Sequence, residues 1–144
     1  MAAGLGELAT LLIGRASRLE RAIGAALAGT PLGAPHWLVL TALHTQPDGR
    51  TMSEVAQLVS LPAATLTRSV DRLVDHALVH RTLDGADRRR VLVGLTDRGR
   101  TTYDEHRAAV DAALAAELDA FADWEREALR GLLTRTSCIN SKWK

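Results

Sequence analysis

Residues 80–96 are the stretch that most limits how this chain can fold. Two runs of strand-forming residues, 78–82 and 91–96, flank a turn that contains Asp84 and Asp87. The stretch carries four arginines but only two acidic residues. It therefore predicts a β-hairpin with a strongly basic tip, attached to a chain whose other periodic segments are helical.

Two short helices with a tight turn between them are predicted just before the hairpin. The first, within residues 51–61, has Thr51 and Ser53 as possible N-caps. The second has Ser60 as a plausible cap and Pro62 in its first turn, where the missing N–H of proline costs nothing. Two short helices in this order predict a helix-turn-helix, and the hairpin after them predicts a wing.

The second of these helices has a surface suited to the major groove of DNA. Ala63, Ala64 and Thr65 provide a flat face near its N-terminus, which lets the backbone come close to the bases. The hydroxyls of Thr65 and Thr67 can bond to bases or phosphates, and Arg68 can bond guanine with two parallel hydrogen bonds. An ordinary solvated helix face is the alternative, and the neighbouring hairpin favours contact with DNA.

The arginines of the hairpin suit a phosphate backbone. The wing carries Arg88, Arg89 and Arg90 next to its turn. It is long enough to reach the adjacent minor groove of DNA, where negative potential attracts arginine. Asp87 cannot favour DNA by its own charge, so we expect it to pair with an arginine and fix its orientation. We expect Arg88 to lie at the tip of the wing, and Arg90 to contact the DNA backbone or to pack at the base of the wing.

The charge pattern of the middle of the chain is compatible with nucleic acid but does not prove it. Residues 50–100 hold nine arginines against six acidic residues, whereas acids are in excess in the flanks. Arg72 is a candidate phosphate contact, or it forms an exposed pair with Asp71. Arg98 and Arg100 stand at a helix start, where surface charge is the simpler interpretation.

Helical patterns account for the rest of the chain. An amphipathic helix begins near Leu5, and residues 36–44 are so continuously apolar that we expect a buried helix. Residues 96–121, with Thr96 as the N-cap, and residues 123–135 predict two more amphipathic helices. Helical periodicity is lost from residue 136. Aromatic residues are only 3% of the chain, so the core must be built from Leu, Val, Ala and Ile.

Cellular location follows from cysteine content and hydropathy. Cys138 is the only cysteine, so no internal disulfide framework can form and a reducing cytoplasm is expected. Apolar runs are too short to cross a bilayer, and the N-terminus has no basic leader, so no membrane partner is expected.

Residues 53–100 resemble the winged helix-turn-helix core of the MarR family of bacterial transcription regulators. The runs VDRLVDHALVHR and DGADRRRVLVGLTDRG carry the resemblance, which extends over most of the chain. It implies a homodimer in which the first and last helices interleave, and recognition helices that enter the major grooves of a pseudo-palindromic site. It also implies three regions, namely a dimerisation helix (1–34), the DNA-binding domain (35–100), and C-terminal dimerisation helices with a tail (101–144). The family usually has glycine where Ala77 stands, so this position would require a positive φ.

The resemblance also implies a ligand site. In this family a small ligand often binds between the dimerisation helices and the DNA-binding lobe, and it weakens DNA binding. His36, Trp37, Thr41 and His44 lie near that place, which suits a small aromatic or phenolic ligand, although Trp37 is more often a core residue. His36 and His44 lack a Cys or acidic partner at metal spacing, so neither a metal site nor a cofactor is expected.

The sequence thus predicts a mainly α fold with a small β-hairpin wing, and a DNA-binding transcription regulator, with a repressor as the first expectation and an activator still open. A winged-helix module for protein–protein contact is the alternative, but its outer helix face would be apolar. An enzyme is not expected, because no phosphate-cradling loop, nucleophile elbow or suitable carboxylate pair is present.

Overall fold

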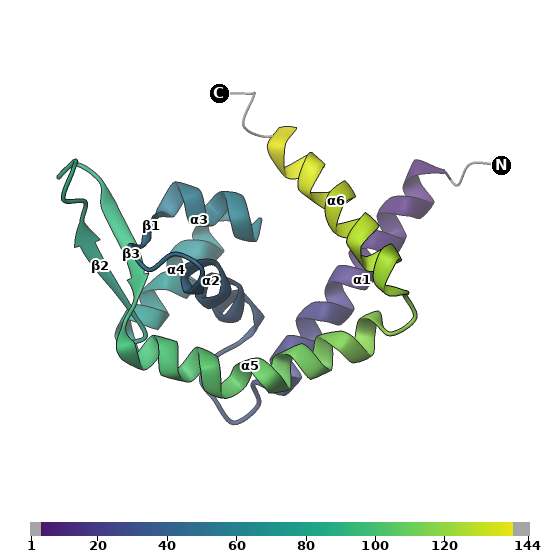
Figure 1. The fold of residues 1–144 in the computed structure, drawn as a ribbon, viewed down its shortest axis with the longest axis horizontal. Coiled ribbons are helices and arrows are strands. Elements are labelled where there is room, and N and C mark those ends of the chain that lie inside the picture. The colour runs from purple at the N-terminus through teal and green to yellow at the C-terminus, as the bar shows by residue number, and fades with distance from the viewer. Residues whose placement is uncertain (1–3, 140–144) are drawn as a thin grey trace.

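The chain forms a small lobe joined to an arm of long helices (Figure 1). The computed structural model describes residues 4–139. The fold is mainly helical with a small antiparallel sheet, as the sequence predicted. The elements are α1 (Leu5–Ala26), α2 (Ala34–His44), β1 (Arg50–Thr51), α3 (Met52–Val59), α4 (Ala63–Asp75), β2 (Val79–Leu83), β3 (Val91–Leu95), α5 (Asp97–Leu118) and α6 (Asp123–Ile139).

The sheet has three strands in the order β1-β3-β2, and both pairings are antiparallel. The sequence predicted the hairpin of β2 and β3 but not β1, whose two residues are too few for a periodic signal. Val93 lies in the middle, opposite Arg50 on one side and Arg81 on the other. Gly49 precedes β1 with a φ of +86°, and a β-carbon there would lie 2.9 Å from the Val93 carbonyl oxygen. Glycine is therefore required for β1 to reach β3.

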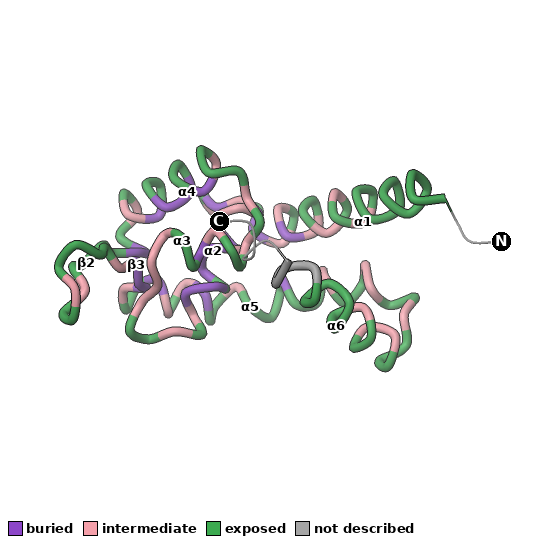
Figure 2. The backbone as a smooth tube through the Cα atoms, turned by 90° about the horizontal axis from the view of Figure 1, so that it is seen from above, coloured by how far each residue is buried: buried purple, intermediate pink, exposed green. Residues whose placement is uncertain are grey.

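The hydrophobic core lies inside the lobe (Figure 2). The helix α2 runs through its centre, and Leu40 and Leu43 are almost fully buried, which confirms the predicted buried helix. Val70 of α4 and Val93 of β3 are completely enclosed against it. These contacts hold the helix-turn-helix and the wing on one scaffold.

Caps and turns mark the ends of the helices. The Thr51 hydroxyl accepts a hydrogen bond from the Glu54 N–H, so Thr51 is the N-cap of α3, as predicted. Thr96 caps α5 by accepting from the Gly99 N–H at 2.9 Å, also as predicted. The expectation for Ser60 is wrong. It ends α3 in a left-handed conformation with a φ of 50°, whereas Pro62 occupies the N-cap of α4.

Ala77 adopts a φ of 56°, so the chain does need a left-handed residue at this position. Its carbonyl accepts a 2.6 Å hydrogen bond from the Thr96 hydroxyl, which fixes the turn between α4 and β2. An alanine in this conformation strains the backbone, because its β-carbon approaches the following carbonyl.

The helices α1, α5 and α6 form the arm. The α5 helix runs from the wing and packs along α1, with its C-terminal end beside the middle of α1 (Figure 1). Arg15 of α1 donates to the carbonyl of Glu117 at 2.8 Å, and Arg18 pairs with the carboxylate of Glu117 at 3.1 Å. The α6 helix continues to Ile139, beyond the predicted end at residue 135. Within residues 4–139, no helix combines the length and apolar character needed to span a membrane.

Candidate nucleic-acid interface

The outer face of α4 presents small and polar side chains. Leu66, Val70 and Leu73 point into the core, because they recur at helical spacing on one side. The opposite side is exposed at Thr67 and Arg68, whereas Thr65 is half-buried. Ala63 and Ala64 are also exposed, at the N-terminal end of the same helix.

Hydroxyl groups on α4 are partly used by the helix itself. The Thr67 hydroxyl donates to the carbonyl of Ala63 at 3.0 Å, which leaves its lone pairs for another donor. Ser69 is buried, and its hydroxyl donates to the carbonyl of Thr65 at 2.8 Å. The first of these bonds holds the Thr67 side chain against the first turn of the helix.

Asp71 and Arg72 do not pair with one another, so that alternative was wrong. Asp71 forms an ion pair with Arg81 of β2, in which the Arg81 Nη2 lies 2.5 Å from the Asp71 Oδ1. The Arg72 Nε donates to the carbonyl oxygen of Pro31 at 3.3 Å. Each residue thus connects α4 to a different part of the chain. The sequence missed both links because their partners are distant along the chain.

Acidic residues orient two of the three wing arginines. The Asp87 carboxylate accepts from the N–H of Arg89 at 3.0 Å and from the Arg89 guanidinium at 3.3 Å. Arg90 lies 3.7 Å from the Asp84 carboxylate and 3.9 Å from that of Glu54. Arg88 is exposed between Asp87 and Arg89 at the turn.

Two of the candidate arginines have no protein partner. Among the residues that the structure describes, neither the Arg68 nor the Arg88 guanidinium forms a hydrogen bond or ion pair with another residue. Arg72, Arg89 and Arg90 would each have to leave a partner to bind a phosphate. Of the candidate arginines, one unpaired guanidinium therefore lies on α4 and one lies on the wing.

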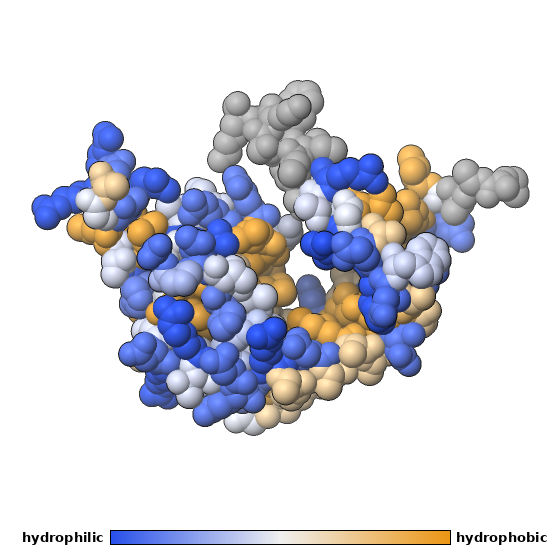
Figure 3. Space-filling model, viewed as in Figure 1, coloured by the Kyte–Doolittle hydropathy of each residue, from blue (hydrophilic) through white to orange (hydrophobic). Residues whose placement is uncertain are grey.

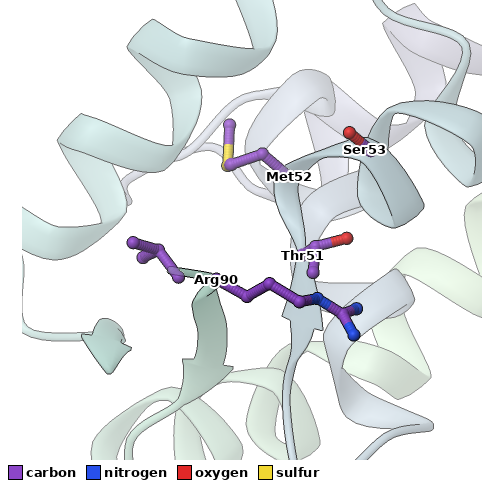
Figure 4. A pocket seen from close by; sticks show the side chains of 5 residues that line it. Thr51, Met52, Ser53 and Arg90 are labelled. Atoms are coloured by element: carbon purple, nitrogen blue, oxygen red, sulfur yellow. The ribbon is translucent and has the colours of Figure 1, made fainter. Parts of the chain in front are cut away.

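A shallow hollow of about 490 Å³ lies between the N-terminus of α3 and the beginning of β3, close to the turn of the wing. Figure 4 shows the Arg90 side chain extending past Thr51, with Met52 and Ser53 on the adjoining turn. The Thr51 N–H donates to the Glu54 carboxylate at 2.7 Å and, with the nearby Arg90, holds the pKa of that carboxyl below its usual value. The sequence identified Thr51 and Ser53 only as possible caps, because their proximity to Arg90 depends on the sheet.

The four predicted ligand residues of α2 differ in their contacts. Trp37 is buried in the core, and its ring stacks on Tyr103 of α5 with centroids 4.7 Å apart. His44 also stacks on Tyr103, at 4.3 Å. Thr41 is exposed, and its hydroxyl donates to the carbonyl of Trp37. Tyr103 was missed because nothing in the local pattern of α5 indicates which element it faces.

The two histidines of α2 lie in different surroundings. The His36 Nδ1 accepts a hydrogen bond from the Gly33 N–H at 2.9 Å. Burial, and then the positive charge of Arg72 and the nearby His76, lower the pKa of His36. The Nδ1 of His44 is buried, and no hydrogen-bond partner for it exists among the described residues. A buried nitrogen without a partner costs free energy and needs an explanation.

Residues 30–90 match the family model described as "MarR family". Solved structures with a similar fold cover nearly all of the chain. CouR from Rhodococcus jostii, bound to p-coumaroyl-CoA, is 29% identical with a TM-score of 0.83, and the match covers 94% of this chain and 96% of CouR.

Two further structures show the same fold. BpsR from Bordetella bronchiseptica, whose DNA binding is regulated by 6-hydroxynicotinic acid, is 27% identical with a TM-score of 0.77, covering 91% of this chain and 98% of BpsR. A MarR variant from E. coli in complex with operator DNA is 24% identical with a TM-score of 0.76, covering 90% of this chain and 93% of that one.

Proposed function

Because the chain is a transcriptional regulator of the MarR family, we propose that it is a sequence-specific repressor. It acts as a homodimer on a pseudo-palindromic operator, and binding of a small aromatic ligand releases the protein from the DNA. Residues 35–100 bind DNA, while residues 1–34 and 101–144 form the dimer. The two lobes then place their recognition helices in successive major grooves, with half-sites roughly 10 bp apart.

One observation carries the proposal of DNA binding. Arg68 on α4 and Arg88 on the wing are exposed, and neither has a partner among the described residues. A guanidinium at each of these places suits the major groove and the neighbouring minor groove. The other proposed contacts are Ala63, Ala64, Thr65, Thr67, Arg72, Asp87, Arg89 and Arg90, with Asp87 acting through Arg89.

The exposed face of α4 also argues against the alternative of a protein–protein module. Such a module would present large apolar side chains there, but Ala63, Ala64, Thr67 and Arg68 occupy this face. BpsR, at 27% identity, is a relative with regulated DNA binding. The polar face of α4 and the similarity to BpsR both favour DNA binding.

Exposed apolar residues support the proposal of a homodimer. They gather on the arm of α1 and α6, where Figure 3 shows hydrophobic surface around the two helices. Leu5 is 85% exposed and Trp124 is 72% exposed. Soluble monomers rarely leave such a patch uncovered, so a second copy of the arm is the natural cover. The other exposed apolar residues on these helices include Leu8, Leu11, Leu12, Ile13 and Leu132.

Stacked rings support the proposal of an aromatic ligand. Tyr103 lies against both Trp37 and His44, and the unpartnered His44 Nδ1 offers a hydrogen-bonding group beside these rings. CouR binds p-coumaroyl-CoA. The DNA binding of BpsR is regulated by 6-hydroxynicotinic acid. His36, next to Trp37, and Thr41, between Trp37 and His44, complete the proposed ligand residues of α2.

Selection of DNA from a random library tests the proposal. The purified chain is mixed with duplex fragments at moderate salt, and the retained fragments are sequenced. We expect a pseudo-palindrome, a dimer on each site, and release of the DNA by an aromatic carboxylate such as p-coumarate or 6-hydroxynicotinate. Retention of no fragment, together with a salt-insensitive protein partner, would favour the protein–protein module instead.

A further inference from the structure

We propose that Asp71 is a positioning residue for DNA recognition, because its ion pair with Arg81 fixes the wing relative to α4. This inference rests on the proposed DNA binding and assigns a role to a residue that does not itself need to touch DNA. The Arg88 side chain at the wing tip and the Arg68 side chain on α4 then reach their grooves in one fixed relative position.

The geometry of the pair connects the two DNA-contacting elements directly. Asp71 lies on α4 one turn after Arg68, on the exposed side of the helix. Arg81 lies in the middle of β2, opposite Val93 of the central strand. The Arg81 Nη2 donates a charge-assisted hydrogen bond to the Asp71 Oδ1, at 2.5 Å. The pair therefore spans the junction between the helix and the wing.

The wing needs such a link because packing holds only its root. Val79 is the one buried residue of β2, and residues 80–83 are exposed. Near the tip, Leu83 is 61% exposed and Val91 is 43% exposed. Few buried contacts mean a segment that opens at low free-energy cost. Besides the Asp71–Arg81 pair, the Arg90–Glu54 pair is the only ion pair between the wing and a helix of the lobe in the described chain.

Stability alone does not account for the Asp71–Arg81 pair. Asp71 is 54% exposed and Arg81 is 36% exposed at the side chain, and pairs of this kind add little to folding. A carboxylate on the DNA-facing side of α4 also repels phosphates, which weakens binding. The presence of Asp71 is explained if holding the wing contributes more to DNA affinity than this repulsion costs.

The sign of one substitution separates the two effects. Asp71→Asn removes a negative charge from the DNA face, so simple electrostatics predicts tighter binding to the selected operator. Loss of positioning predicts weaker binding, by about tenfold, which is within the range for coupled residues in contact. Asp75→Asn is the matched control, since Asp75 is exposed on the same helix and has no partner among the described residues. We expect it to bind as tightly as the original chain or slightly more tightly.

A double-mutant cycle with the wing tip identifies the cause. If Asp71 acts by placing Arg88, then Asp71→Asn costs about tenfold in the original chain but little once Arg88→Ala has removed the wing contact. Hydrogen exchange provides a readout without DNA. We expect the backbone amides of β2 to exchange faster in Asp71→Asn, and to keep their original rate in Asp75→Asn.

The outcomes distinguish this inference from the proposed function. Weaker binding by Asp71→Asn that disappears in the Arg88→Ala background, with faster exchange in β2, supports it. Equal or tighter binding in both backgrounds, with unchanged exchange, overturns it while the DNA-binding function stands. If the original chain retains no DNA, the proposed function and this role of Asp71 fall together, and faster exchange would then show only a structural link.

Discussion

The backbone of Gly99 lies directly against the carbonyl group of Leu78, so closely that a β-carbon on residue 99 would be 2.0 Å from the carbonyl oxygen. That oxygen also accepts a 3.1 Å hydrogen bond from the Thr96 N–H. The first turn of α5 therefore packs directly on the start of the wing. Because both sides of the contact are backbone, no side chain can move aside to relieve a clash.

Substitution of Gly99 by alanine should therefore be costly. We expect Gly99→Ala to lower the free energy of unfolding by roughly 3 kcal/mol, as for severe overpacking. Chemical denaturation monitored by circular dichroism measures the change. Gly85→Ala is the control, since nothing lies within 4 Å of the added carbon, and it should be neutral or stabilising by about 0.5 kcal/mol. Equal stability of the two variants would contradict the close contact between Gly99 and Leu78.

A glycine at position 77 should stabilise the protein. Ala77 has a φ of 56°, and glycine adopts this conformation without a β-carbon clash. We expect Ala77→Gly to raise the free energy of unfolding by about 1 kcal/mol. Ala108→Gly, in the exposed middle of α5, should instead destabilise by about 1 kcal/mol. A thermal melt of both variants tests the opposite signs, and a loss of stability in Ala77→Gly would refute the account of this turn.

The sequence predicted the parts of the molecule whose signals are local. The caps Thr51 and Thr96, the apolar α2 helix and the hairpin all depend on neighbouring residues. The left-handed conformation of Ala77 was expected only from the resemblance to the MarR family, which usually has glycine there. Ser60 was assigned wrongly because a serine can either start one helix or end another, and the local pattern does not distinguish these roles.

Contacts between distant segments could not be predicted. The partner of Asp71 is on the wing, the partner of Arg72 is in the loop before α2, and Tyr103 meets Trp37 across the core. Each contact depends on how the elements pack, which sequence periodicity does not specify. The two residues of β1 were also missed, since they become a strand only by pairing with β3.

The pH dependence of stability should contain a contribution from His36. Its folded-state pKa is lowered from the usual 6.5 by burial first, and then by Arg72 and His76. The unfolded chain therefore binds a proton more readily, so stability is full above about pH 6.5 and falls as the pH drops from there through the lower folded pKa. Denaturation of the original chain and of His36→Gln between about pH 5 and 8 measures this difference. A stability gap between the two that does not change with pH would contradict it.

His44 should lower the stability of the folded chain and contribute to ligand binding. The buried Nδ1 lacks a partner among the described residues, so we expect His44→Phe to stabilise the chain by about 1 kcal/mol while it keeps a ring against Tyr103. The same change should weaken binding of an aromatic carboxylate, as measured by calorimetry. Unchanged ligand affinity would remove His44 from the proposed ligand site, and lower stability would mean that its nitrogen is satisfied in solution.

We propose that α4 and the wing bind one DNA duplex together. The most direct test is the affinity for the selected operator, measured over a series of salt concentrations. The account predicts a loss of about a thousandfold or more between roughly 50 and 200 mM salt, if the dimer neutralises six or more phosphates. Arg68→Ala should cost about 1–3 kcal/mol and relax the preference at one base pair. Arg88→Ala should weaken binding to all sequences and flatten the salt dependence. Affinities of both variants that equal that of the original chain at every salt concentration would contradict the account.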